Sequence, residues 1–194
     1  MNQAERRLFL IKTLLAEDAR FRHAEIPDDE EDQKSMLRSL FNIRMPRPIS
    51  EEFIKVQDEY LQETLKTKGI TDFSTLQPVK PGIYLWRGDI TTLRCDAIVN
   101  AANNQMLGCF APCHRCIDNA IHTFSGIQLR EACAKFMAEQ KHPEPTGQAK
   151  ITPAFTGCFN KKLMGTPPFY LQVKSTIFLK AWSFISLRNI ILIF

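Results

Sequence analysis

The chain has 194 residues and a mass of 22.3 kDa, and its 44% hydrophobic and 24% charged residues exclude a disordered tail. Its formal net charge of +4 arises entirely in residues 156–194, which hold five basic residues and no acidic residue, whereas residues 1–155 carry 20 basic and 21 acidic residues. A basic average that comes from one segment does not indicate a nucleic-acid surface, and we expect no nucleic-acid partner.

Three amphipathic helices are predicted in residues 1–68. Leucine and isoleucine recur at helical spacing over residues 2–18. A second helix is predicted over 29–43, where an acidic run at its start complements the positive end of the helix. A third begins after Ser50, a good N-cap residue, and ends at Gly69. We expect residues 1–68 to form a helical extension with no chemistry of its own.

Strand and helix patterns follow from residue 82 onward. Residues 82–88 and 96–100 are predicted to be strands, with a polar turn between them. Residues 117–140 are predicted to be a helix that Gly126 interrupts, and 149–154 a third strand. Together these elements predict an α/β layer.

Two asparagines follow the buried strand. Open α/β sheets bind ligands at the carboxyl ends of their strands, where loop amides and the next helix N-terminus converge. Asn100 and Asn103 can each donate and accept hydrogen bonds, which suits a ribose or an amide. Asparagine pairs also cap turns, so both interpretations remain open.

A cysteine and histidine cluster lies in the next loop. Cys109, His114 and Cys116 offer two thiolates and an imidazole, which suit tetrahedral zinc with a fourth position left for water or substrate. Cys113 is an alternative ligand, but it abuts His114, and adjacent side chains rarely converge on one ion. The spacing alone leaves zinc ligands and ordinary buried thiols equally open. No signal peptide pattern opens the sequence, so we expect reduced cysteines and a cytoplasmic location.

Asp118 and His122 lie on one face of the helix that follows. Asp118 could orient a ligand, assist a water or cap the helix, and capping is the expected role without further context. A histidine four residues after it is more often a packing residue than a base, and we expect packing for His122.

Several motifs together resemble a known family. These are Gly88-Asp-Ile-Thr91, Asp96-Ala-Ile-Val-Asn-Ala-Ala-Asn103 and Ile117-Asp-Asn-Ala-Ile-His122. The combination resembles the macrodomains, and Gly108-Cys-Phe-Ala-Pro-Cys-His-Arg-Cys116 resembles the zinc-containing macrodomain ADP-ribosylhydrolases of microbes, which also carry a helical N-terminal extension. The resemblance covers about residues 1–155 and implies a three-layer α/β/α sheet, with residues 69–155 as a partial macrodomain.

The resemblance also implies a function and a set of site residues. It implies that the protein hydrolyses ADP-ribose from mono-ADP-ribosylated proteins with a zinc ion; a non-catalytic ADP-ribose-binding module and a structural zinc protein are the alternatives. Carried over by position, Asp89 and Ile90 hold the adenine, and Asn100 and Asn103 surround the distal ribose. The resemblance further implies that Asn100, Asn103 and Asp118 take part in catalysis, and that Cys109, His114 and Cys116 bind zinc.

The resemblance ends near residue 155. Residues 156–194 show no alternation that fits the further strands of a macrodomain, and we expect an aberrant or frameshifted end on a truncated domain. A sheet that is incomplete at its C-terminal end exposes edges and apolar faces, so we expect marginal stability and impaired hydrolysis. Lys180, Arg188 and Asn189 interrupt residues 176–194, which argues against a membrane span.

Overall fold

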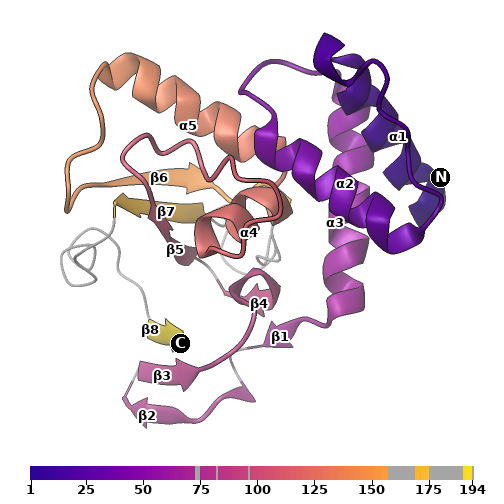
Figure 1. Cartoon of the computed structure of the whole chain (residues 1–194). Helices are drawn as coiled ribbons and strands as arrows, with labels where there is room; N and C mark the ends of the chain where they lie inside the picture. The colour runs from indigo at the N-terminus through magenta and orange to yellow at the C-terminus, as the bar shows by residue number, and fades with distance from the viewer. Residues whose placement is uncertain (73–74, 82, 96, 157–168, 175–189, 194) are drawn as a thin grey trace.

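Three helices form the N-terminal part of the molecule, as the periodicity predicted. The computed structural model describes residues 1–72, 75–81, 83–95, 97–156, 169–174 and 190–193. The helices are α1 (Gln3–Ala16), α2 (Glu30–Ile43) and α3 (Glu51–Lys68), and a short 3-10 turn, η1 (Ala19–Phe21), follows α1 (Figure 1). Side chains of Asn2, Asp29 and Ser50 cap the three N-termini, and Gly69 ends α3 with a φ of 87°.

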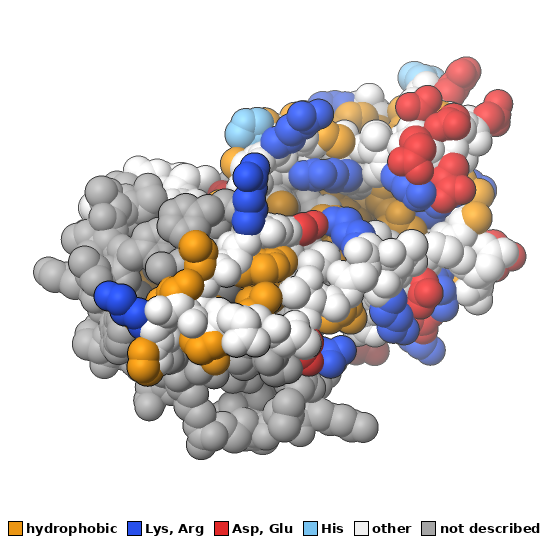
Figure 2. Space-filling model, turned by 90° about the horizontal axis from the view of Figure 1, so that it is seen from below, with side chains coloured by type: hydrophobic (Ala, Val, Ile, Leu, Met, Phe, Trp, Pro, Cys, Tyr) orange, Lys and Arg blue, Asp and Glu red, His pale blue; other side chains and the backbone are white. Residues whose placement is uncertain are grey.

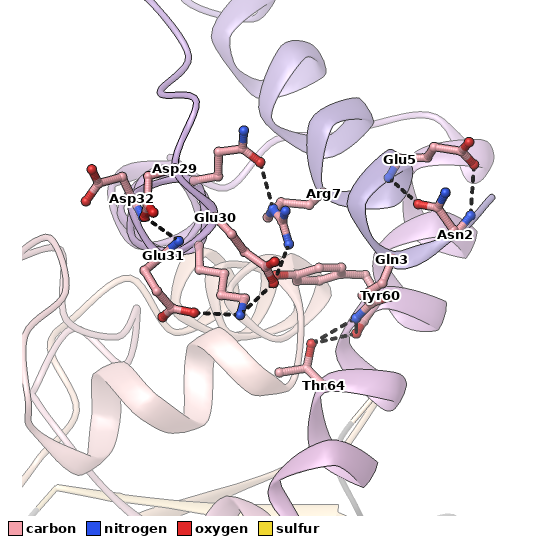
Figure 3. A network of polar contacts seen from close by, with 12 residues as sticks. Asn2, Gln3, Glu5, Arg7, Asp29, Glu30, Glu31, Asp32, Tyr60 and Thr64 are labelled. Carbon is pink, nitrogen blue, oxygen red and sulfur yellow. Dashed lines mark hydrogen bonds and ion pairs between the residues drawn. The ribbon is translucent and has the colours of Figure 1, made fainter.

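Apolar residues from all three helices make one hydrophobic cluster, hereafter the helical cluster. Its most buried members are Leu10, Ile11, Leu37, Phe53 and Leu61. Polar contacts on one side of this bundle also join the helices (Figure 3). The buried Arg7 of α1 donates to Gln33 of α2 at 3.0 Å and lies 3.4 Å from Glu30, while Gln3 donates to the carbonyl of Tyr60 at 2.8 Å.

The rest of the described chain alternates strands and helices. Its elements are β1 (Thr71–Asp72), β2 (Pro78–Lys80), β3 (Ile83–Trp86), the 3-10 turn η3 (Ile90–Thr92), β4 (Leu93–Arg94), β5 (Ala97–Ala102), α4 (Ile117–Phe124), α5 (Ile127–Gln140), β6 (Ala149–Pro153), β7 (Phe169–Lys174) and β8 (Ile190–Ile193). The predicted strands and the predicted break at Gly126 are therefore confirmed. This α/β part with N-terminal helices matches the expected fold class.

The strands pair in three small sheets. Strand β1 pairs with β4, β3 lies between β2 and β8, and β7 lies between β5 and β6. Strand β7 runs parallel to β5, from Ala97 opposite Phe169 to Ala102 opposite Lys174, and antiparallel to β6. Strand β8 runs parallel to β3.

The described part of residues 156–194 contains two short strands, although the sequence shows no alternation there that fits further strands. Strands β7 and β8 both lie in this segment, and β7 fills the place between β5 and β6. Alternation is the pattern of a half-exposed strand, and the four residues of β8 are all apolar and offer none. The expected frameshift and the interrupted stretch at 176–194 concern residues that lie mostly outside the described part.

Helices α4 and α5 pack on the β5 face that presents Ile98, Asn100 and Ala102. Residues from β5, η3, α4, α5 and the end of β6 make a second hydrophobic cluster, hereafter the sheet cluster, whose members include Leu93, Met106, Ile121, Leu129 and Ala154. The two clusters adjoin, because Ile127 at the start of α5 belongs to the helical cluster.

The surface differs between the two parts. Charged side chains of both signs gather over one end of the molecule, at the right of Figure 2, and hydrophobic side chains are more frequent on the face of the remaining described residues seen there. The described helices include none with the length and hydrophobicity that a membrane crossing requires.

Candidate metal centre and ligand site

A buried polar pair joins the carboxyl end of β5 to the first turn of α4. Asn100 has no exposed surface, and its Nδ2 donates to Asp118 Oδ1 at 2.7 Å. Burial raises the pKa of the Asp118 carboxyl, while the hydrogen bond from Asn100 and the charge of Arg130 act in the opposite direction. The structure thus brings together two of the predicted site residues from separate elements.

Three further predicted residues converge in the loop before α4. The ligand atoms of Cys109, His114 and Cys116 all lie within 4.8 Å of one another, and Cys109 Sγ is 3.6 Å from His114 Nδ1. Tetrahedral zinc, with bonds of about 2.3 Å to sulfur and about 2.0 Å to nitrogen, separates neighbouring sulfur and nitrogen ligands by roughly 3.5 Å. Two thiols and an imidazole at this spacing fit zinc.

The loop that carries these residues is closed by Asn103. Asn103 Nδ2 donates to the Gly108 carbonyl at 3.1 Å, and its Oδ1 accepts from the Gln105 backbone at 2.9 Å. Gly108 has a φ of 78°, and a Cβ there would lie 2.7 Å from the His122 ring. Asn103 is an exposed residue, and its two hydrogen bonds set the path of the chain into Cys109.

Cys116, not Asp118, caps α4. The Cys116 thiol accepts from the Asn119 backbone N–H at 3.4 Å, and α4 begins at the next residue. The expected capping role of Asp118 was wrong, because the side chain at the second helical position turns inward to Asn100 instead of back to the helix end.

Cys113 lies apart from the three ligands and faces α2. Its Sγ is 3.3 Å from Ser39 Oγ and 3.4 Å from the Ser35 carbonyl oxygen, and its φ is 52°. The left-handed backbone at Cys113 turns its side chain away from that of His114. Adjacent side chains do not converge here, as the sequence argument expected.

His122 is a buried packing residue, as predicted. Its side chain is 2% exposed, and its Nε2 lies 3.5 Å from Asp118 Oδ1, too long for a hydrogen bond. Burial lowers the pKa of His122 to about 3, and the positive charge of Arg130 adds to this effect. His122 is therefore neutral at physiological pH and presents an imidazole ring to Gly108.

Asp89 and Ile90 lie at the start of η3, which packs against α4. The Asp89 carboxylate accepts from the Thr91 backbone at 2.9 Å and from the Thr91 hydroxyl at 2.6 Å, and it pairs with Lys68 at 3.0 Å. Burial would raise the pKa of Asp89, but these donors together lower it. Ile90 is buried in the sheet cluster. Within the described part of the chain, the hydrogen bonds of the Asp89 side chain lead to Thr91 and Lys68 and not to the metal ligands.

Three residues that the sequence analysis did not single out support this region. Arg130 of α5 is buried and donates to the Leu107 carbonyl and to three carbonyls at the end of α2, and its guanidinium lies over the Phe110 ring. Arg38 and Asn42 of α2 contact the metal-ligand loop itself. For Arg130 the sequence offered one signal, a charged residue between the apolar residues Leu129 and Cys133 of the predicted helix. For Arg38 and Asn42 it offered none, because polar residues are common on the exposed face of a helix.

Sequence comparisons agree with these observations. A sequence model described as "Macro domain" matches residues 99–168, so the match begins in β5 and passes residue 155, where the resemblance was expected to end. A protein of Treponema medium named "Protein-ADP-ribose hydrolase" is 58% identical over 159 residues, which are 80% of this chain and 61% of that protein. A protein of the same name from Staphylococcus aureus (strain COL) is 46% identical over 128 residues, 66% of this chain and 48% of that one.

The chain thus spans about half to three fifths of the length of these relatives. Among solved structures, a Trypanosoma brucei macrodomain in complex with ADP is 25% identical, with a TM-score of 0.44 over 72% of this chain and 59% of that one. The macro domain match and the two similar sequences both include the asparagine strand and the loop before α4. Residues 99–168 of the chain therefore resemble a macro domain, and three N-terminal helices precede them.

Proposed function

We propose that the protein hydrolyses the bond between ADP-ribose and a mono-ADP-ribosylated protein, with a zinc ion held by Cys109, His114 and Cys116. The observation that carries this proposal is the position of the three ligand atoms, within 4.8 Å of one another, in the loop that joins β5 to α4. The names of the similar proteins from Treponema and Staphylococcus support the reaction class.

The polar residues at the end of β5 have distinct roles in this proposal. Asn100 and Asn103 would hydrogen-bond the distal ribose. Asn100 also fixes one oxygen of Asp118, so that the carboxylate would meet the ribose or a water with its other oxygen. A carboxyl whose pKa burial raises is suited to accept a proton near neutral pH. Asp118 is therefore the proposed general base.

The adenine end of the ligand would lie at η3. Asp89 would accept a hydrogen bond from the exocyclic amine, beside the backbone of Ile90. Thr91 and Lys68 already hold the Asp89 carboxylate in one orientation, so little side-chain entropy would be lost on binding.

The metal would act at the opposite end of the ligand. Zinc with three protein ligands keeps a fourth position, at which it polarises an oxygen ligand and lowers the pKa of a bound water. His114 is exposed and both cysteines are partly exposed, so substrate can reach this position from solvent. Thiolates persist in a reducing compartment, and we propose a cytoplasmic location.

The test combines metal content with turnover in the full chain. We expect one zinc per chain by elemental analysis and release of ADP-ribose from a mono-ADP-ribosylated protein. Cys109→Ser and His114→Gln should remove both while leaving helical circular dichroism unchanged. His23→Gln, at an exposed histidine remote in sequence from the loop, is the matched control and should retain both.

The other outcomes decide between functions. A wild-type chain that binds ADP-ribose without releasing it from protein would make the protein a binding module. Loss of the folded state in Cys109→Ser would make the metal structural. Soluble wild-type chain without zinc would contradict the metal-dependent reaction.

A further inference from the structure

The metal-ligand loop is fastened to α2 at its middle residue. The Cys113 backbone N–H donates to Asn42 Oδ1 at 2.9 Å, and the Cys113 thiol lies against Ser39 and the Ser35 carbonyl. These contacts hold the centre of the loop through a residue outside the ligand set. The helical extension therefore contacts the candidate metal centre directly, which was not expected for residues 1–68.

Arg38 makes a second connection, closer to the ligands. Its Nη2 donates to the His114 carbonyl at 3.0 Å and to Asn119 Oδ1 at 2.9 Å. The Asn119 backbone N–H in turn donates to the Cys116 thiol. The Arg38 guanidinium thus fixes the backbone of His114 and the side chain of Asn119, and the backbone of Asn119 contacts Cys116.

Helix α2 is itself held firmly against the α/β part. Asn42 is 1% exposed, and its Nδ2 donates to the Thr123 hydroxyl at 2.9 Å. Arg130 donates to the carbonyls of Phe41, Asn42 and Arg44 at 3.0, 2.8 and 2.6 Å. The carbonyls at the end of α2 lack partners within the helix, so the arginine both satisfies them and fixes the helix position.

We propose that Arg38 and Asn42 of α2 are positioning residues for the metal ligands, and that metal binding and the docking of α2 are thermodynamically linked. This inference rests on the proposed metal site and assigns a role to the extension. Removing a group that orients a metal ligand typically weakens metal binding by about 10- to 100-fold. Because linkage is reciprocal, metal that binds more tightly when α2 is docked must stabilise the docked α2 by the ratio of the two affinities.

Zinc affinity of the full chain, measured by competition with a chromophoric chelator, tests the positioning role. Arg38→Met should weaken zinc binding by about 10-fold or more, and Arg38→Lys, which cannot reach both acceptors, should recover little of it. Lys34→Met is the matched control, because Lys34 lies one turn earlier on α2 and forms ion pairs with Glu30 and Glu31 of the same helix. It should leave zinc affinity within about twofold.

Amide hydrogen exchange of α2 tests the linkage and does not depend on turnover. Zinc should slow exchange in the second half of α2 in the wild type, and this effect should shrink in Arg38→Met. Equal zinc affinity of wild type and Arg38→Met, with each chain folded by circular dichroism, overturns this inference alone. A folded wild-type chain that takes up no zinc overturns the proposed metal site and this inference together.

Discussion

Individual buried polar residues set the geometry of the candidate site. Asn100 and Asp118 would each be costly to bury alone, and their hydrogen bond at 2.7 Å offsets part of that cost. The sequence predicted which residue types gather here, because the motif is contiguous around the strand and the loop. It did not predict that Cys116 would cap α4, since a thiol is an unusual cap and the choice depends on the inward turn of Asp118.

His122 makes stability depend on pH. Its pKa is about 3 in the folded chain and about 6.5 when unfolded, so the unfolded chain binds more protons between these values. The contribution of neutral His122 to stability is fully present above pH 6.5 and is lost as the pH is lowered towards 3. The expected loss between pH 7 and pH 5 is about 2 kcal/mol.

Urea unfolding of the wild type and His122→Leu at both pH values measures this contribution. The wild type should lose about 2 kcal/mol more than the variant on going from pH 7 to pH 5. Asp118 and Arg130 face the ring in both chains, and their own titration cancels to first order in the difference. Parallel pH profiles would show that His122 stays protonatable in the fold.

Element boundaries followed from local chemistry, whereas pairings between distant elements did not. The three N-terminal helices began and ended within two residues of prediction, because their caps at Asp29, Ser50 and Gly69 are encoded beside them. The pairing of β5 with β7 and the contact of α2 with the metal-ligand loop depend on residues 70 or more positions apart. No periodicity in the sequence carries that information.

Gly126 makes the break between α4 and α5 possible. Its φ is 82°, and a Cβ there would collide with the Gln57 side chain, whose Oε1 accepts from the Ile127 backbone at 3.0 Å. Gly126→Ala should therefore cost about 2 to 4 kcal/mol in thermal or urea unfolding.

Gly69→Ala is the matched control for this collision. Gly69 also has a positive φ, 87°, but nothing lies within 4 Å of a Cβ built there. Its cost should be limited to backbone strain of about 1 to 2 kcal/mol. Equal losses for the two substitutions would show that the Gln57 contact contributes nothing beyond strain.

The ends of α1 and α2 are joined by a buried ion pair. Arg44, with a side chain 4% exposed, donates to Glu17 at 2.7 and 2.8 Å. Burial would raise the pKa of Glu17, but Arg44 and Arg47 lower it below its usual value. The pair therefore stabilises the fold above about pH 4.5, and this contribution disappears as the pH falls through the lowered pKa.

Glu17→Gln tests the pair by leaving the buried Arg44 charge uncompensated. We expect a loss of about 3 kcal/mol in the free energy of unfolding at pH 7, and a smaller difference from wild type near pH 3. Glu63→Gln removes an exposed pair with Lys66 and should change stability by less than about 1 kcal/mol. A Glu17→Gln effect that is the same at both pH values would contradict the assignment.

At the scale of the whole molecule, the helical and sheet clusters form one structure through polar contacts at their boundary. Gln57 of α3 accepts from Ile127 of α5, Asn42 of α2 donates to Thr123 of α4, and Arg130 binds carbonyls of both parts. The sequence separated the extension from the α/β part by composition and period alone. It could not show this boundary, because each contact between the two parts joins residues 70 or more positions apart.

Arg130 is expected to hold the two clusters in one cooperative unit. It is 4% exposed, burial lowers its pKa to about 10, and it satisfies the Leu107 carbonyl on one side and three α2 carbonyls on the other. Arg130→Met leaves these acceptors buried without a donor, and we expect a loss of at least about 3 kcal/mol. Lys135→Met, at an exposed position of the same helix, should cost less than about 1 kcal/mol.

Two probes followed in the same urea titration test the cooperative role separately from the energy. Helical circular dichroism reports mainly on α1 to α3, and Trp86, which packs against the sheet cluster, is the one tryptophan left in a Trp182→Phe background. The two transitions should coincide in the parent chain and separate in Arg130→Met, since cooperativity between clusters requires the contacts that join them. Coincident transitions in both chains would assign the coupling to Gln57 and Asn42 instead.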